Sequence, residues 1–232
     1  MFTLHIALRP FARRIARVSL VASVGFLIAA CHRGSSPLLA SNPPRLDAMA
    51  PDSFVVRFET TRGDFDLKVH RDWSPRGSDR LHWLISHGFY DRARFFRVVP
   101  GFIVQFGISA DTAVARAWKP HRITDDPVAR SNVRGTLSFA TSGPNTRTVQ
   151  LFINTNDNAR LDQRGFSPLA QVIAGMPVVD SLYSGYGEGA PRGSGPSQEL
   201  IEREGDAYLA RNFPKLDQIL RARMMQVYSA RR

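Results

Sequence analysis

The sequence is poor in cysteine, in metal-ligand spacings and in long apolar runs. Cys31 is the only cysteine in 232 residues, which excludes an internal disulfide and zinc sites built on paired cysteines. The histidines are not spaced as metal ligands usually are, and the adjacent pair Asp125-Asp126 favours a turn over a metal site. The sequence also has no Gly-x-Ser-x-Gly segment of the kind that marks many serine hydrolases. We therefore expect a fold that is held together by its hydrophobic core, with no metal site.

Lysine is also rare, although the chain is basic. Only three of the 31 basic residues are lysine, and the formal net charge is +11. The arginines are scattered without a long basic run, which argues against a nucleic-acid partner, although positive charge favours anionic surfaces. A hydrophobic fraction of 43% with 22% charged residues is typical of a globular domain, and we expect a monomer.

Acidic residues are absent from the first 30 positions. Four arginines between positions 9 and 17 precede an apolar run from Val18 to Ala30, which is short for a hydrocarbon layer of about 30 Å. This is the layout of a secretory signal peptide, predicted for residues 1–30. The segment Ile28-Ala29-Ala30-Cys31 resembles a bacterial lipobox, which implies lipidation of Cys31. A plain signal peptide, or a short membrane anchor with an incidental cysteine, is the alternative.

The stretch behind Cys31 is expected to be a flexible tether. Residues 31–52 are rich in Ser, Pro, Asn and Ala, a composition typical of linkers, and the folded domain is predicted to span residues 53–228. Lipidated Cys31 would hold this domain outside the cytoplasm, on the cell membrane or the outer membrane, facing the periplasm.

Periodic apolar residues predict a mainly β domain with a few helices. The predicted strands are 54–58, 65–69, two stretches between 95 and 106, 135–140, 149–154 and 169–173. The predicted helices begin at Ser74-Pro75, with a stop at Gly88, and at Met176.

The region near the C-terminus is less regular. Residues 184–213 are predicted to be an insertion that consists of a glycine-rich loop, 184–197, followed by a helix. Residues 216–227 fit either a last strand or an amphipathic helix, and we favour the strand.

Two segments resemble the cyclophilins. Residues 95–105, FFRVVPGFIVQ, are similar to that family's Phe-His-Arg-hydrophobic-hydrophobic-Pro-Gly-Phe-x-x-Gln. Residues 135–146, GTLSFATSGPNT, with QLFI at 150–153, are similar to Gly-x-hydrophobic-Ser-hydrophobic-Ala-x-x-Gly-Pro-Asn-Thr followed by Gln-Phe-Phe-Ile. Order and spacing agree from about Phe54 to Leu182.

The resemblance implies a cyclophilin-like, eight-stranded, closed antiparallel β-barrel capped by helices, here with an extra helix near the C-terminus. It also implies an enzyme that rotates Xaa-Pro bonds in proline-containing polypeptides without a cofactor. By position, the implied catalytic residues are Arg97 and Gln105. The implied substrate-binding residues are Phe102, Ile103, Ala140, Thr141, Gln150, Phe152, Leu161 and Phe166.

Four positions depart from the family's pattern. Phe96, Phe106 and Arg160 stand where the family usually has histidine, glycine and, in many eukaryotic members, tryptophan. Phe166 falls near the family's usual pocket histidine, where its aromatic ring could still form a wall of the pocket. We therefore keep two functions open. The first is an isomerase that accelerates folding of extracytoplasmic proteins. The alternative is a cyclophilin-like module or chaperone of low activity that binds proline-containing segments.

Overall fold

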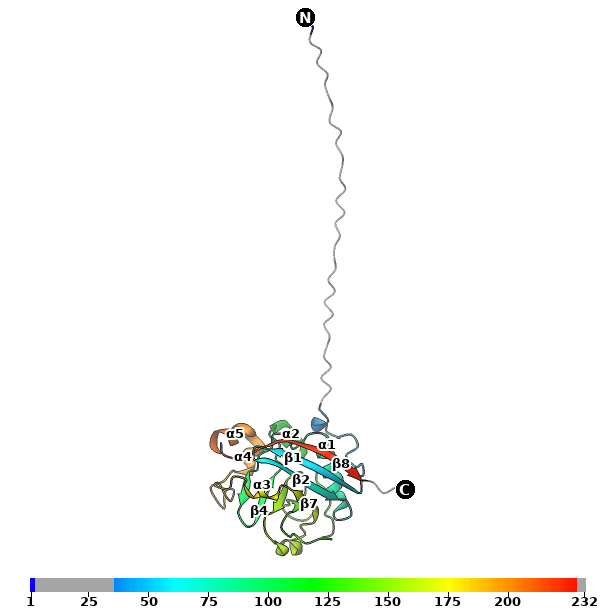
Figure 1. The fold of residues 1–232 in the computed structure, drawn as a ribbon, viewed down its shortest axis with the longest axis vertical. Helices are drawn as coiled ribbons and strands as arrows, with labels where there is room; N and C mark the ends of the chain where they lie inside the picture. Colours follow the sequence, from blue (N-terminus) through cyan, green and yellow to red (C-terminus); the bar gives the residue numbers. More distant parts are fainter. Residues whose placement is uncertain (3–35, 229–232) are drawn as a thin grey trace. The chain divides into compact units, whose positions relative to one another are not determined.

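Eight antiparallel strands form the framework of the domain in the computed structural model, which describes residues 1–2 and 36–228 (Figure 1). Cys31 and nearly all of the predicted signal peptide lie outside the described residues. The strands are β1 (Ser53–Thr60), β2 (Gly63–His70), β3 (Arg97–Val99), β4 (Ile103–Phe106), β5 (Thr136–Phe139), β6 (Leu151–Asn154), β7 (Pro168–Ala174) and β8 (Ile219–Tyr228).

The sheet is a curled half-barrel with the strand order β3-β4-β6-β5-β7-β2-β1-β8. The expectation of a closed barrel is not confirmed, because no ladder joins β3 to β8 in the described part of the chain. The segment before β3 meets the segment before β8 at an isolated bridge between Arg94 and Gln218. Arg92, just before that bridge, has a φ of 66°, so the backbone turns there instead of extending the ladder.

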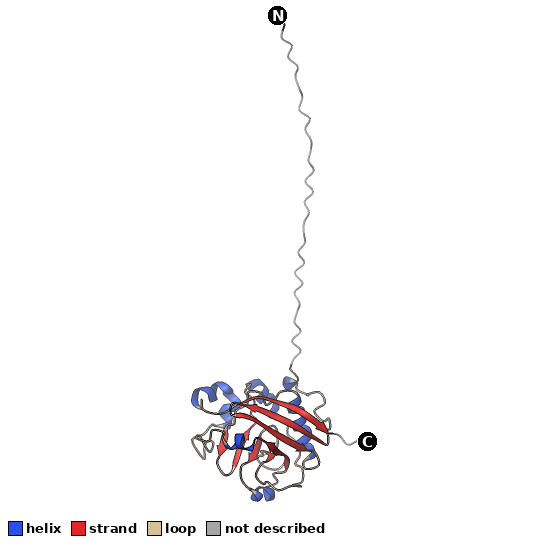
Figure 2. Ribbon diagram, in the orientation of Figure 1, coloured by secondary structure: helices blue, strands red, loops and turns tan. Residues whose placement is uncertain are grey.

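The helices pack around the strands (Figure 2). They are α1 (Pro75–Ser86), α2 (Thr112–Trp118), α3 (Met176–Asp180), α4 (Gln198–Glu204) and α5 (Asp206–Asn212), with short 3₁₀ helices η1 (Pro37–Leu39) and η2 (Ala159–Arg164). Proline in the first turn of α1 and β8 as the last strand are as predicted. No helix in the described ranges has the length and apolar character needed to cross a membrane.

Two helical features differ from the prediction. Helix α2 was not expected; it is one short helix whose first N–H groups, on Ala113 and Val114, donate to the Asp111 side chain. The single helix expected after residue 197 is in fact α4 and α5, which lie together at one end of the sheet (Figure 1). Gly205 separates them with a φ of 63°, a conformation that suits glycine.

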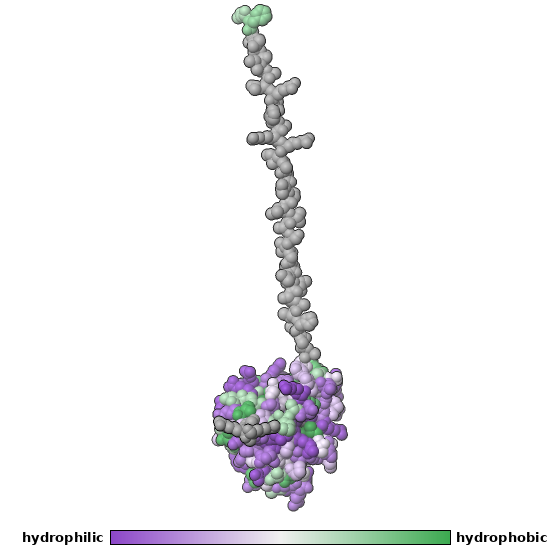
Figure 3. Space-filling model, turned by 90° about the vertical axis from the view of Figure 1, so that its right-hand side faces the viewer, coloured by the Kyte–Doolittle hydropathy of each residue, from purple (hydrophilic) through white to green (hydrophobic). Residues whose placement is uncertain are grey.

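Alternation along the strands separates an inner core from an outer face. The inner side chains include Phe58 and Phe65, stacked with ring centroids 5.1 Å apart, and Phe106, whose ring lies 5.7 Å from that of Phe58. All three rings are at most 1% exposed. In contrast, the face of the domain seen in Figure 3 is mostly hydrophilic with small scattered apolar patches, as is usual for a surface in water.

The segment that precedes β1 contacts the domain. The indole N–H of Trp118 donates to the Leu38 carbonyl (3.0 Å), and that of Trp83 donates to the Pro44 carbonyl (2.9 Å). The Ala50 N–H donates to Asp79 (2.7 Å). These contacts fall within the stretch expected to be a tether, whose boundaries stay a prediction.

Replacing Phe106 with Ala should lower the free energy of unfolding by about 3–5 kcal/mol, because it removes a fully buried ring and leaves a cavity. Met225→Ala is the control, since Met225 is 44% exposed, and it should change stability little. Urea denaturation followed by circular dichroism measures both. A loss below 1 kcal/mol for Phe106→Ala would contradict the described core.

Candidate functional site

The pairing of β3, β4 and β6 sets which side chains share the outer face of the sheet. Arg97 lies opposite Gln105, and Gln105 lies opposite Phe152. Directly opposed residues project to the same face, so these three side chains form a row across three strands. Their sequence neighbours Val104 and Ile153 belong to the inner core.

A cavity of about 480 Å³ opens on this outer face. All ten residues to which the sequence assigned a catalytic or substrate-binding role line it: Arg97, Phe102, Ile103, Gln105, Ala140, Thr141, Gln150, Phe152, Leu161 and Phe166. The structure thus brings together residues that are spread over 70 positions of the sequence.

One half of the cavity is apolar. Ile103, Phe152 and Leu161 form a small buried cluster, each at most 4% exposed, against which Phe102 and Phe166 pack. The rings of Phe152 and Phe166 meet edge to face with centroids 5.4 Å apart. This hollow is separate from the main core and faces outward, so it can receive an apolar ring from a ligand.

The other half is polar and hydrogen-bonded in series. Arg97 Nη1 donates to Gln105 Oε1 (2.9 Å), and Gln105 Nε2 donates to Gln150 Oε1 (2.9 Å). The Arg97 guanidinium carbon lies 5.7 Å from the centre of the Phe102 ring. A permanent cation therefore stands beside the apolar hollow, and two amides that do not titrate orient it.

Glu188 is part of this site, and the sequence did not indicate it. Its two carboxylate oxygens accept from Arg97 Nε (2.6 Å) and Nη2 (2.7 Å). The hydrogen bonds from Arg97 lower the pKa of Glu188 below its ordinary value, against the opposing effect of partial burial. Glu188 comes from the glycine-rich loop, 91 positions from Arg97, where no local pattern marks it.

The strand edge of Ala140 and Thr141 forms a further wall of the cavity. The Ala140 N–H donates to the Gln150 carbonyl (2.9 Å). Beyond this edge the chain continues into a loop, 141–148, in which Thr146 and Thr148 also line the cavity.

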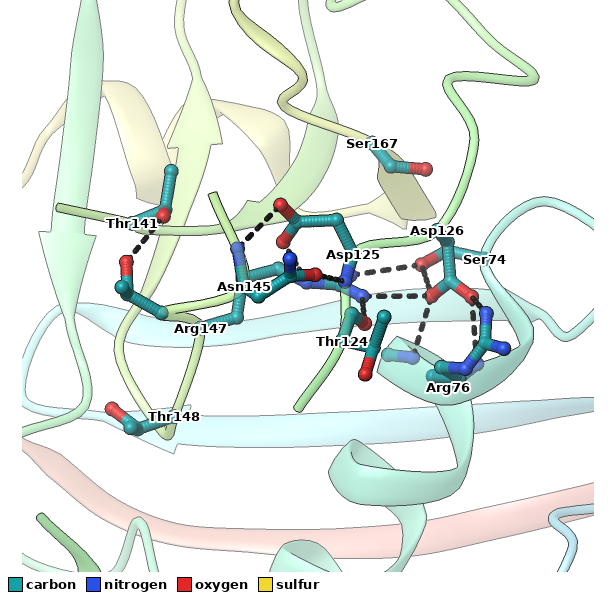
Figure 4. A network of polar contacts seen from close by, with 12 residues as sticks. Ser74, Arg76, Thr124, Asp125, Asp126, Thr141, Asn145, Arg147, Thr148 and Ser167 are labelled. Carbon is teal, nitrogen blue, oxygen red and sulfur yellow. Dashed lines mark hydrogen bonds and ion pairs between the residues drawn. The ribbon is translucent and has the colours of Figure 1, made fainter. Parts of the chain in front are cut away.

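A buried ionic network fixes this loop to α1 (Figure 4). Arg147, 1% exposed, pairs with Asp126 at 3.1 Å. Asp126 also accepts from the Ser74 hydroxyl (2.6 Å) and the Gly77 N–H (2.9 Å). Burial by itself raises the pKa of Asp126, but these hydrogen bonds and the Arg147 charge outweigh burial and lower it.

The sequence profile described as cyclophilin type peptidyl-prolyl cis-trans isomerase/CLD matches residues 55–199. The chain belongs to the cyclophilin-type peptidyl-prolyl cis-trans isomerases. It is therefore an isomerase by family, as the two sequence segments predicted.

Relatives and solved structures agree with this membership. The chain is 34% identical over 138 residues to peptidyl-prolyl cis-trans isomerase A of Dickeya dadantii (strain 3937), covering 57% of this chain and 73% of the relative. It is 32% identical over 136 residues to peptidyl-prolyl cis-trans isomerase B of Escherichia coli (strain K12), covering 55% and 83%. A crystal structure of a cyclophilin type isomerase from Cryptosporidium parvum shares the fold, with a TM-score of 0.54 at 18% identity, over 75% of this chain and 98% of that one.

Phe96 and Phe106, two of the residues that depart from the family pattern, are both buried in hydrophobic clusters. Phe96 is 2% exposed and packs in a second hydrophobic cluster with Ile201 of α4 and Leu209 of α5. Phe106 fills the main core. A third departure, Arg160, lies with its guanidinium carbon 4.9 Å from the centre of the Phe102 ring.

Asp126→Asn should lower the free energy of unfolding at pH 7 by about 3 kcal/mol, because it removes the buried counterion of Arg147 and leaves only Asp125, whose side chain is 32% exposed. The pKa of Asp126 is lowered in the folded state, so its contribution is present above the ordinary carboxyl pKa and disappears as pH falls through the lowered value. The difference in the free energy of unfolding between wild type and Asp126→Asn should therefore become smaller as the pH falls.

Chemical denaturation over a pH series measures this difference. Asp72→Asn, at an exposed position, serves as the control and should show a small effect at every pH. A constant difference for Asp126→Asn across the series would contradict the described network.

Proposed function

We propose that this cyclophilin catalyses rotation about Xaa-Pro bonds in polypeptides outside the cytoplasm, and that it is lipid-anchored through Cys31. One observation carries the catalytic part of the proposal: the guanidinium of Arg97 stands at the edge of an outward-facing apolar hollow, held there by Gln105. The anchor rests on the sequence of the first 31 residues alone.

The energy that the site must provide is modest. The prolyl amide has a rotational barrier of about 20 kcal/mol from resonance, and uncatalysed exchange takes roughly 10–100 s. Turnover in milliseconds requires an acceleration of about 10⁴–10⁵, or roughly 5–7 kcal/mol of transition-state stabilisation. Since no covalent bond is made or broken, no nucleophile is needed.

The two halves of the cavity suit the two requirements of this rotation. The hollow around Phe152 and Leu161 holds the proline ring while the rest of the amide turns. As the amide twists, its nitrogen loses conjugation and becomes basic, and the N–H groups of Arg97 donate to it. Because the planar substrate lacks this basic nitrogen, the contact favours the transition state over the ground state.

The backbone of the substrate is expected to lie along the Ala140–Thr141 edge, which lines the same cavity. A peptide at a strand edge gains main-chain hydrogen bonds that do not depend on its sequence. Such binding suits a folding catalyst that must accept many clients. The alternative function, a binding module with little turnover, would use the same hollow and the same edge.

Arg97→Ala should lower kcat/KM in a protease-coupled assay on a proline peptide by about 10²–10³-fold, because it removes the transition-state donor. The fold should persist, since Arg97 is not in the main core. Arg221→Ala, on the exposed side of β8, is the matched control and should keep wild-type activity. An active Arg97→Ala variant would reject its catalytic role, and an inactive wild type would favour the binding module.

Cys31→Ser should release the protein from membranes. When the full chain is expressed in a Gram-negative bacterium, the wild type should label with radioactive palmitate and sediment with the membrane fraction, because acyl chains anchor by about 0.8 kcal/mol per buried CH₂. The serine variant should do neither. Palmitate labelling that persists in the variant, or that is absent from the wild type, would contradict the lipid anchor.

A further inference from the structure

The glycine-rich loop between α3 and α4 reaches the catalytic arginine directly. Glu188 binds Arg97 through both carboxylate oxygens at 2.6 and 2.7 Å. Side-on pairing of a carboxylate with a guanidinium is charge-assisted and sets the plane of the guanidinium as well as its position. Gln105 alone, bonded at one nitrogen, would leave the group free to turn about that bond.

The ion pair with Glu188 leaves some N–H groups of Arg97 without a hydrogen bond. Arginine carries five N–H hydrogens, and the contacts with Glu188 and Gln105 account for three of them. One N–H on each terminal nitrogen has no partner among the described residues. These two donors are available to a substrate while the ion pair is intact.

Glu188 is itself held by its own loop. The Gly189 N–H donates to its carboxylate (3.2 Å), and the Gly195 N–H donates to its carbonyl (2.9 Å). The chain at Gly193 passes so close that an added Cβ would collide with the Glu188 carbonyl oxygen. The backbone that presents the carboxylate is therefore tightly packed at this residue.

The base of the loop is anchored in the second hydrophobic cluster. The ring of Tyr186 meets those of Tyr183 and Phe213 edge to face, both with centroids 5.0 Å away, and Tyr186 packs against the cluster that includes Phe96. Phe96 is the residue next to Arg97. The insertion and the catalytic strand therefore share one packed unit.

The loop forms a wall of the cavity and does not fill it. Ala190, Pro191 and Arg192 line the cavity yet remain exposed, and a volume of about 480 Å³ remains beside them. A plug would instead bury these residues in the apolar hollow. The arrangement suits a fixed support for Arg97 better than an inhibitory lid.

We infer that Glu188 is a positioning residue for Arg97, supplied by the insertion, which holds the guanidinium plane in the orientation that the twisted prolyl amide requires. This inference rests on the proposed function of Arg97. It also gives the glycine-rich loop a role in the reaction, although Glu188 lies outside the two segments, 95–105 and 135–153, that resemble the cyclophilins.

Glu188→Gln tests the inference, because glutamine keeps the size of the side chain and loses the charged, two-oxygen acceptor. We expect kcat/KM for a proline peptide to fall about tenfold, since misorientation of one donor weakens a transition-state contact. Peptide affinity, measured separately by calorimetry, should change less than twofold. Glu199→Gln, a carboxylate that is 86% exposed on α4, is the matched control and should behave as wild type.

Two further variants separate positioning from general damage. In an Arg97→Ala background, Glu188→Gln should have no additional effect, because residues that act through one group are non-additive. Gly193→Ala keeps the carboxylate but displaces its backbone, and it should lower turnover as Glu188→Gln does. Thermal unfolding of each variant controls for loss of fold.

The Arg97 Nε–H resonance in ¹H–¹⁵N NMR gives a readout that needs no turnover. It is assigned by its absence in Arg97→Ala. In the wild type it should exchange slowly with water, and in Glu188→Gln it should exchange at the rate of exposed arginines. Unchanged or higher activity in a folded Glu188→Gln variant, or an unchanged Nε–H signal, would overturn the inference. An inactive wild type would instead overturn the proposed function, so the two failures are distinct.

Discussion

The register between β3, β4 and β6 is the constraint on which the site depends. It sets Arg97, Gln105 and Phe152 in one row on the outer face, while Val104 and Ile153 enter the inner core. Side chains alternate along a strand, so a slip of one residue would bury the arginine and expose the core. The packing of the core and the geometry of the site are thus consequences of the same pairing.

The glycine-rich loop and helices α4 and α5 also contact strand β3 and the residue before it. Phe96, the neighbour of Arg97, packs with the cluster formed by α4, α5 and the loop, and the loop returns Glu188 to the arginine. Phe96 and the two helices are complementary, since burial of its ring requires an apolar cover and α4 and α5 provide it. The guanidinium of Arg97 is thus held by Gln105 from the sheet and by Glu188 from the loop.

Much of the fold and of the site could be predicted from sequence, because both are encoded in short-range patterns. Strand alternation located the strands, and the two cyclophilin-like segments marked Arg97 and Gln105 together with Phe102, Ile103 and Phe152 of the apolar hollow. The features that were missed are long-range. Glu188 meets Arg97 across 91 positions, and the open edge between β3 and β8 depends on a turn at Arg92, neither of which leaves a periodic signal.

The central claim is that the hollow beside Arg97 holds a proline ring. Nuclear Overhauser measurements on the protein with a short alanine–proline peptide test it most directly. We predict contacts from the proline ring protons to the aromatic protons of Phe102 and Phe152, whose side chains line the hollow. Contacts confined to residues outside the cavity, with none to these two rings, would contradict the account.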